Sequence, residues 1–290
     1  MKRAYVAGAL GHSDVCVYLS NVSRNMQTAE DLRNMGVAVF VPSVDLLMGI
    51  KFGDYVYTDY FENSQPWLDK SDFVYLTPGW EESKGTKKEI KRAKRQGIPI
   101  FYSYAQVREF LKPVIICIVG ESGSGKTLMA EWFEKLYGYN LIQSYTTRPK
   151  RTLDENGHTF ITDKDFNKFL EDDEEMIAST QWGDVRYCCL RKDVRDYNTY
   201  VIDEHGLNTL WERYADDFHI FDIRVHSDEW ERINEVGKDR VERDKGRFTM
   251  GDIEFNYKFK NEYVLKDLIT FVEQTHTDIH KKFIDICLLK

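Results

Sequence analysis

A glycine-rich loop near the middle of the chain constrains the fold more than any other feature. Residues 120–127 read Gly-Glu-Ser-Gly-Ser-Gly-Lys-Thr and satisfy the phosphate-loop pattern G-x-x-x-x-G-K-[ST]. The apolar, β-branched run 114–119 before it is typical of a buried parallel strand, and residues 128–136 after it have helical spacing. A strand, a glycine loop and a helix in this order predict an α/β fold that binds phosphate.

The side chains of the loop predict its ligand. Backbone N–H groups of such a loop cradle phosphates, Lys126 reaches the terminal ones, and the Thr127 hydroxyl ligates Mg²⁺. We therefore expect a nucleoside triphosphate here, with Lys126 acting in catalysis. The loop residues expected to bind it are Gly120, Ser122, Gly123, Ser124, Gly125, Lys126 and Thr127.

The length of 290 residues predicts two domains. Strand-like and helical segments alternate over residues 1–111, which favours a parallel sheet with helices on both faces. The alternation restarts after Pro113, so residues 112–290 are expected to form a second α/β domain of the same kind. In the first domain we expect strands at 4–7, 37–41, 73–76 and 98–102 and helices at 23–35, 86–96 and 105–111.

Composition excludes several classes of protein. No apolar run approaches the roughly 18 residues of a membrane span, so no membrane partner is expected. The five cysteines are odd in number and lack C-x-x-C spacing, which indicates thiols in a reducing cytoplasm, or in the host cytoplasm if the protein is viral. A net charge of −8 argues against broad nucleic-acid binding, although a local basic patch is compatible with it.

A basic block follows the phosphate loop. Residues 144–151 read Ser-Tyr-Thr-Thr-Arg-Pro-Lys-Arg, with three cations within four residues. Arginine suits phosphate because its planar guanidinium donates two parallel hydrogen bonds. The alternative is a solvated basic loop. The position of the basic block, about 20 residues after a phosphate loop, favours a nucleoside monophosphate site.

From these motifs, residues 114–270 resemble the guanylate kinase family. The specific parts are the GESGSGKT loop, the S-x-T-T-R block with an arginine three residues later, the Asn-Gly turn before Phe160, and Val-Ile-Asp at 201–203 followed by Gly206. The resemblance implies ATP and Mg²⁺ as cofactors and a nucleoside monophosphate as acceptor. It assigns Ser144, Arg148 and Arg151 to the acceptor phosphate and Asp203 to the vicinity of Mg²⁺.

Further residues are assigned by the same resemblance. The segment 232–243 resembles the family's lid, in which Arg240 and Arg243 would stabilise charge on the transferring phosphoryl group. The alternative for this segment is an ordinary charged helix. Asn261 matches the position that contacts adenine. His158 and Tyr187 are assigned to the acceptor, while a surface histidine is the alternative for His158.

Two positions depart from the family pattern. The glutamate that reads guanine falls on Ala178, and its hydroxyl partner falls on Cys189. A buried polar base edge left unpaired costs roughly 1–3 kcal/mol per group. GMP is therefore disfavoured as the acceptor, and another nucleotide, deoxy or modified, fits better.

The first domain carries its own motif, Ser-x-Gly-x-x-x-Glu at Ser83, Gly85 and Glu89, after a predicted strand. Ligands bind at the carboxyl ends of strands in such folds, and a helix N-terminus receives phosphate. The alternative is a helix cap, with Ser83 or Thr86 as the cap and Glu89 on the helix face, paired with nearby lysines.

Residues 2–104 resemble the nucleoside 2-deoxyribosyltransferase superfamily, which includes deoxynucleoside 5′-monophosphate N-glycosidases and has a Rossmann-like fold. The resemblance assigns Glu89 as the nucleophile at the sugar C1′ and Tyr5 as the residue that positions the glutamate or the sugar. It also implies that the loop 8–14, which begins at Gly8, lines the site. Relatives often complete their sites across a subunit interface, so a homodimer is expected. The family's acidic residue is replaced by Ser64, for which Asp59 or Glu62 could substitute.

Together the two motif sets predict a bifunctional enzyme of nucleotide metabolism, of the kind a phage uses to remodel its host's nucleotides. It would join a nucleoside monophosphate kinase to a deoxynucleotide N-glycosidase or deoxyribosyltransferase. One alternative is a kinase with a non-catalytic nucleotide-sensing module, because Ser64 replaces the expected acid. Others are a peptide-binding scaffold and a kinase acting on nucleic-acid 5′ ends.

Overall fold

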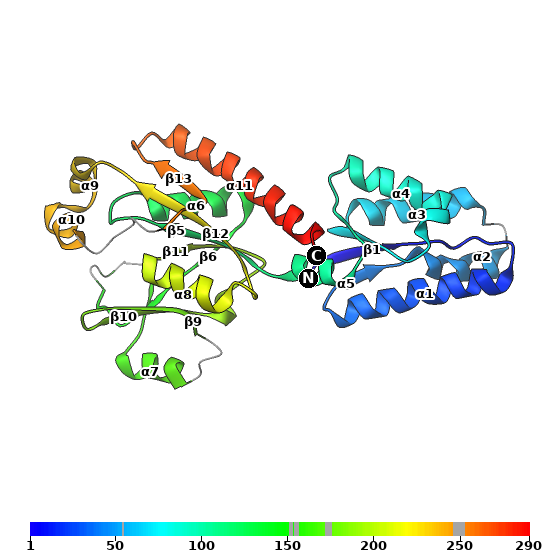
Figure 1. Cartoon of the computed structure of the whole chain (residues 1–290), viewed down its shortest axis with the longest axis horizontal. Coiled ribbons are helices and arrows are strands. Elements are labelled where there is room, and N and C mark those ends of the chain that lie inside the picture. Colours follow the sequence, from blue (N-terminus) through cyan, green and yellow to red (C-terminus); the bar gives the residue numbers. More distant parts are fainter. Residues whose placement is uncertain (54, 151–152, 154–156, 172–175, 246–252) are drawn as a thin grey trace. The chain divides into compact units, whose positions relative to one another are not determined.

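A computed structural model describes residues 1–290 except 54, 151–152, 154–156, 172–175 and 246–252. The chain divides into two compact units, one of residues 1–111 with 283–290 and the other of residues 112–282 (Figure 1). The segment 283–290, which the sequence analysis placed in the second domain, therefore groups with the first unit. No helix in the described part of the chain is long and apolar enough to cross a membrane.

The first unit is built on a parallel sheet with strand order β2-β1-β3-β4. Helices α3 and α4 cover one face of the sheet and α1 covers the other (Figure 1). Residues 4–7 of β1 and all of β3 are buried, with Tyr5 and Phe73 fully inaccessible. The strands are β1 (Arg3–Ala7), β2 (Ala38–Phe40), β3 (Phe73–Leu76) and β4 (Ile100–Phe101), and the helices are α1 (Val15–Asn34), α2 (Leu46–Phe52), α3 (Tyr57–Asp69), α4 (Lys84–Arg95) and α5 (Tyr104–Leu111).

Helix α1 starts eight positions before the predicted residue 23. Asp14 caps it, because its carboxylate accepts hydrogen bonds from the backbone N–H groups of Cys16 and Val17. Helices α2 and α3 were not predicted. Helix α3 carries Pro66 in its interior, which is a residue that normally argues against a helix.

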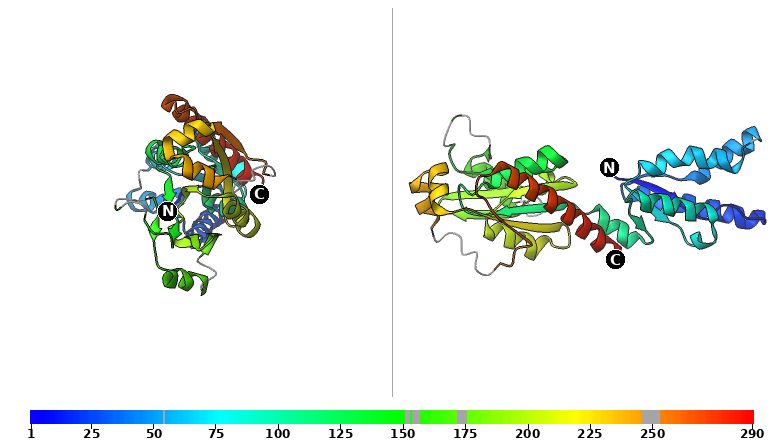
Figure 2. Two further views of the ribbon diagram at one scale, coloured as in Figure 1. Left: turned by 90° about the vertical axis from the view of Figure 1, so that its left-hand side faces the viewer. Right: turned by 90° about the horizontal axis from the view of Figure 1, so that it is seen from above.

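The second unit has a five-stranded parallel sheet in the order β13-β12-β5-β11-β6. Helices α6 and α11 cover one face and α8 covers the other (Figures 1 and 2). The strands are β5 (Val114–Val119), β6 (Asn140–Ile142), β11 (Tyr197–Val201), β12 (His219–His226) and β13 (Tyr257–Lys260), and the helices are α6 (Lys126–Tyr137), α8 (Glu204–Tyr214), α9 (Glu229–Val236), α10 (Lys238–Asp244) and α11 (Leu265–Leu288). Both units are thus α/β with parallel sheets flanked by helices, as predicted.

A smaller sheet in the second unit was not predicted. Its strand order is β8-β7-β10-β9, and the pairs β7–β10 and β10–β9 are antiparallel. It contains residues that the sequence analysis assigned to the acceptor. Its elements are β7 (Tyr145–Thr146), β8 (Thr159–Phe160), β9 (Met176–Trp182) and β10 (Val185–Leu190), with helix α7 (Asp163–Glu171) beside them.

Candidate functional site

The phosphate loop leaves the central strand of the large sheet. All six residues of β5 are buried, and helix α6 begins at Lys126. A Cβ atom at Gly120 would lie 2.0 Å from the carbonyl oxygen of Val225. Gly123 and Gly125 have φ angles of 81° and 95°, which side chains other than glycine rarely adopt. The three glycines are thus required by space or by backbone conformation.

Lys126 is the half-buried cation of the loop. Its Nζ donates to the carbonyl oxygen of Glu121 at 2.7 Å. Burial lowers the pKa of Lys126 to about 8, and the charge of Arg240 contributes to the lowering, against the opposing effect of the Asp244 and Glu121 carboxylates. An anion bound at the loop would counter both causes, because it places a further negative charge beside this cation.

Asn261 and Tyr263 brace the loop. The Asn261 amide nitrogen donates to the carbonyl oxygen of Ser124 at 3.0 Å, and its amide oxygen accepts from the backbone N–H of Tyr263 at 2.9 Å. The Tyr263 hydroxyl donates to the carbonyl oxygen of Gly123. Asn261 lines the cavity at the loop but is only 3% exposed. Its amide therefore holds the loop in shape, a role that the sequence analysis did not assign to it.

The segment 232–243, predicted to be a lid, lies within helices α9 and α10, which meet at Gly237 and lie against the loop. The Asp244 carboxylate accepts from the backbone N–H of Ser122 at 3.1 Å. The Arg232 guanidinium lies 3.8 Å from the Glu121 carboxylate. Asp244 thus accepts a hydrogen bond from a backbone N–H group of the kind that binds phosphate. The sequence analysis missed Asp244, because an acidic residue at the end of a charged run belongs to no motif.

Most predicted nucleotide-site residues meet at one cavity of about 820 Å³. The cavity joins the phosphate loop to the small sheet, and Asp203 lines it as well. Arg243 belongs to α10, but its side chain lies outside the described residues, as do the whole of Arg151 and Asn156 of the Asn-Gly turn. The predicted residues that line the cavity are Ser122, Gly123, Gly125, Lys126, Thr127, Ser144, His158, Tyr187, Asp203, Arg240 and Asn261.

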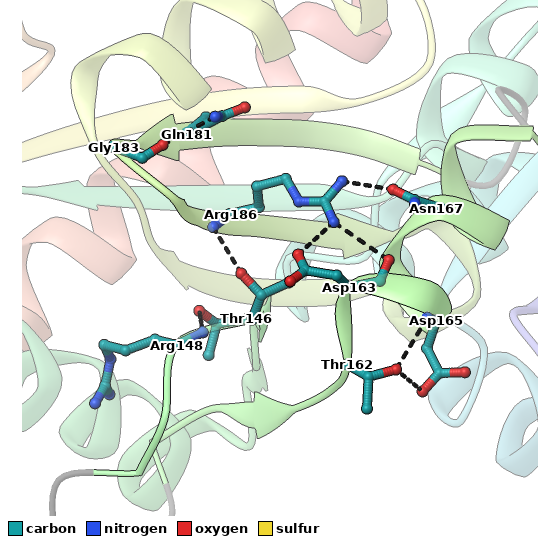
Figure 3. Close-up of polar contacts among 10 residues, drawn as sticks. Thr146, Arg148, Thr162, Asp163, Asp165, Asn167, Gln181, Gly183 and Arg186 are labelled. Carbon is teal, nitrogen blue, oxygen red and sulfur yellow. Dashed lines mark hydrogen bonds and ion pairs between the residues drawn. The ribbon is translucent and has the colours of Figure 1, made fainter.

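Arg148 is not among the residues that line this cavity. Its guanidinium donates to the carbonyl oxygen of Pro149 at 2.9 Å and lies 5.3 Å from the ring centre of Phe160. Figure 3 shows this side chain extending away from the cluster around Arg186. A role on the acceptor phosphate therefore requires Arg148 to change its rotamer.

Asp203 is held by three hydrogen bonds. One carboxylate oxygen accepts from the backbone N–H of Gly206 at 2.8 Å, which caps α8, and from the Thr180 hydroxyl at 3.0 Å. The other accepts from the Trp182 indole at 3.1 Å. These bonds fix the carboxylate at the junction of the two sheets. Thr180 and Trp182 were not predicted, although they alternate with Ala178 along one face of β9.

Ala178 and Cys189 are directly paired across β9 and β10. They are 2% and 0% exposed, and Ala178 lines the cavity. Burial raises the pKa of the Cys189 thiol to about 12, so the thiol stays protonated at neutral pH. The pairing therefore places both departures from the family pattern at one spot, and this spot lacks strongly polar side chains.

Arg186 fastens the small sheet to α7 (Figure 3). Its guanidinium contacts the Asp163 carboxylate at 2.5 Å and the Asn167 amide oxygen at 2.7 Å, and it lies over the ring of Phe166. The backbone N–H of Arg186 donates to the Thr147 hydroxyl. These contacts hold the small sheet and α7 together, which sequence patterns did not indicate.

In the first unit, Tyr5 and Glu89 meet as the resemblance implied. The Tyr5 hydroxyl donates to the Glu89 carboxylate at 2.5 Å. Burial raises the pKa of Glu89, and the hydrogen bond from Tyr5 opposes this shift. Burial, and then the charge of Glu89, raises the pKa of Tyr5 well above its usual range, while a hydrogen bond with Ser64 opposes the rise. Tyr5 therefore remains a donor at neutral pH.

The other predicted residues of the first unit have structural partners. The Ser83 hydroxyl accepts from the backbone N–H of Thr86 at 3.1 Å and caps α4, in agreement with the capping alternative; Gly85 lies in the first turn of that helix. A Cβ atom at Gly8 would lie 1.9 Å from the Thr77 hydroxyl. Asp59, a proposed substitute for the missing acid, caps α3 instead.

Comparisons with known proteins match part of the chain to a family model and the fold to solved structures. A family model described as a domain of unknown function, DUF4406, matches residues 2–102. No curated protein matches the chain. Among solved structures, the crystal structure of guanylate kinase from Anaplasma phagocytophilum is similar, with a TM-score of 0.45 and 18% sequence identity. That similarity covers 61% of this chain and 89% of the guanylate kinase.

Proposed function

We propose that the second unit is an ATP-dependent nucleoside monophosphate kinase. The observation that carries this proposal is the half-buried Lys126, which lies in a glycine loop and shares one cavity with Asp203, Ser144 and Arg240. A loop of this geometry suits the phosphates of a nucleotide, and a second polar wall facing it suits the acceptor. One cavity therefore offers contacts for both partners of phosphoryl transfer.

The loop fits ATP and Mg²⁺. A Cβ atom at Gly125 would lie 2.3 Å from the Asn261 amide nitrogen. The loop backbone therefore packs directly against Asn261 and leaves no room for a side chain at this position. The Thr127 hydroxyl and the Asp203 carboxylate would hold Mg²⁺, directly or through water. The bound metal would neutralise charge on the transferring phosphoryl group. Lys126 and Arg240 would orient the phosphates and stabilise the same charge from the protein side.

We further propose that the acceptor is a deoxynucleoside or modified monophosphate other than GMP. The pair Ala178 and Cys189 offers neither the carboxylate nor the hydroxyl that would hydrogen-bond a guanine edge. Polar side chains that line the same cavity include Ser144, Thr180 and Tyr187. They favour a base that needs fewer hydrogen bonds on its outer edge.

A substrate panel tests both statements. The full chain is incubated with ATP, Mg²⁺ and each nucleoside or deoxynucleoside monophosphate, and products are measured by mass spectrometry. We expect a diphosphate from at least one acceptor and little or none from GMP. Absence of any diphosphate would contradict the kinase. A preference for GMP would contradict only the acceptor assignment.

A second activity is favoured by the contact between Tyr5 and Glu89. We propose that the first unit cleaves the N-glycosidic bond of a deoxynucleotide. The Glu89 carboxylate would attack the sugar C1′ and form an ester, while the base would leave with the bonding electrons and take up a proton. Water would then hydrolyse the ester and return the carboxylate. The competing proposal is a nucleotide-sensing module that binds without cleavage.

Base release separates these two proposals. Wild-type chain and the Glu89→Gln variant are incubated with deoxynucleoside monophosphates, without ATP, and free base is measured. Release by the wild type alone supports the glycosidase. Binding of a deoxynucleotide by both proteins, with no base release by either, supports the sensing module.

A further inference from the structure

Helix α4 carries a continuous stripe of cations on its outer face. Its twelve residues include seven lysines and arginines and one carboxylate, Glu89, which bonds Tyr5 on the inner side. The inner face is completed by the buried residues Thr86, Ile90 and Ala93. The spacing of the exposed cations, i, i+3, i+4, i+7, i+10 and i+11, places them on one side of the helix. They are Lys84, Lys87, Lys88, Lys91, Lys94 and Arg95.

The stripe opposes the stability of its own helix. Like charges three and four residues apart repel each other on a helix surface. Lysines at the N-terminal end also oppose the helix dipole, and the first turn of α4 contains no acidic residue. The cation of α4 that pairs with Asp69 is Arg92, which lies beside the stripe, while Lys88 lies over the ring of Phe61. Such a face gains stability when it is covered by negative charge.

We propose that the outer face of α4 binds the sugar-phosphate backbone of a nucleic acid. From Lys84 to Arg95 the helix rises about 16 Å at 1.5 Å per residue. One strand of a duplex presents a phosphate about every 3.4 Å, so the stripe spans roughly five phosphates. The net charge of −8 led us to expect no broad nucleic-acid binding, but half of the fourteen cations in residues 1–111 lie in this one helix.

The chemistry of the face favours nucleic acid over a membrane. A helix that lies on a lipid surface exposes an apolar side for insertion. The apolar side of α4 is Ile90 and Ala93, and it packs in the core of the first unit with Tyr5 and Val74. The exposed side offers positive charge alone. Such charge contacts phosphates irrespective of the base sequence.

Fluorescence anisotropy with labelled single-stranded and duplex oligonucleotides tests the proposal on the full chain. We expect binding that weakens as salt rises from about 50 to 200 mM, with a log–log slope near −3 for about four contacts on a single strand. A variant with Lys84, Lys87, Lys91 and Lys94 replaced by Gln should bind at least tenfold more weakly and show a shallower slope. A matched control replaces Lys192, Lys258, Lys266 and Lys281, four exposed lysines of the second unit, by Gln.

Thermal unfolding of the same proteins separates binding from folding. Because the substitutions in α4 remove like-charge repulsion, the α4 variant should unfold at the same temperature as the wild type or higher. The proposal is overturned if the wild type shows no salt-dependent binding at about 50 mM salt. It is also overturned if the control loses as much affinity as the α4 variant, or if only anionic phosphatidylserine vesicles are bound.

Discussion

The two units place half-buried groups of opposite charge on the helix that follows a strand of an α/β fold. In the second unit, Lys126 is the first residue of α6, the helix that follows the central strand. In the first, the half-buried group is the Glu89 carboxylate of α4, and its partner is the neutral Tyr5 hydroxyl. A cation at a glycine loop suits the binding of phosphate, and a carboxylate suits attack on a sugar carbon. The comparison teaches that the sign of the half-buried charge distinguishes the two candidate sites, although their folds are of one class.

The largest expected effect is on base release. Replacing Glu89 by Gln removes the proposed nucleophile but keeps an acceptor for the Tyr5 hydroxyl, so base release should fall to background while diphosphate formation is unchanged. The control is Glu82→Gln, an exposed carboxylate just before α4. Chromatographic assay of free base checks this. Base release at the wild-type rate by the Glu89→Gln variant would contradict the proposed role of Glu89 as the nucleophile.

The next effect is on phosphoryl transfer. Lys126→Ala should lower kcat/KM for diphosphate formation about 10²–10³-fold, the usual cost of one electrostatic contact to a transition state. Lys135→Ala, on the same helix but exposed, should change little. Base release should be unaffected by either. Equal losses in the two lysine variants would show that the position of Lys126 in the loop is not what matters.

A smaller effect concerns the lid. Asp244 and a nucleotide phosphate would compete for the backbone N–H of Ser122. Asp244→Asn weakens the competing hydrogen bond by about 1 kcal/mol, so the Kd for ATP should fall roughly fivefold by calorimetry. Asp239→Asn, also in α10 but exposed, is the control. A weaker affinity in the Asp244→Asn variant would mean that the carboxylate supports nucleotide binding.

The mildest effect is on pH dependence. In the free protein the pKa of Lys126 is lowered to about 8, so its positive charge is lost as pH rises through that value. ATP affinity measured by calorimetry should therefore decline above about pH 8. Lys126→Arg binds more weakly but keeps its charge over this range, so its affinity should not depend on pH in the same way. An identical decline in both proteins would place the titration elsewhere.

The parts of the fold that could be predicted from the sequence are those with local signals. The phosphate loop can be recognised because its glycines, Lys126 and Thr127 lie within eight residues that link a strand to a helix. The α/β alternation is likewise a property of neighbouring residues. Helix α3 was missed because Pro66 argues against it locally, and packing of Leu68 in the core compensates.

The site was predicted less completely, because its contacts join distant residues. Asp244 reaches Ser122 across 122 positions, and Trp182 reaches Asp203 across 21. Neither contact has a spacing that a motif could encode. Tyr5 and Glu89, 84 positions apart, were paired only through a family resemblance. Arg148 had a local phosphate-binding signal, yet its guanidinium contacts Pro149 and Phe160 instead.

The most direct test of two separate sites is one mass-spectrometric assay of diphosphate and free base. Wild type, Lys126→Ala and Glu89→Gln are each incubated with ATP, Mg²⁺ and the panel of deoxynucleoside monophosphates. We expect both products from the wild type, only free base from the Lys126 variant, and only diphosphate from the Glu89 variant. The account would be contradicted if either variant lost both products. It would also be contradicted if both variants still formed both products.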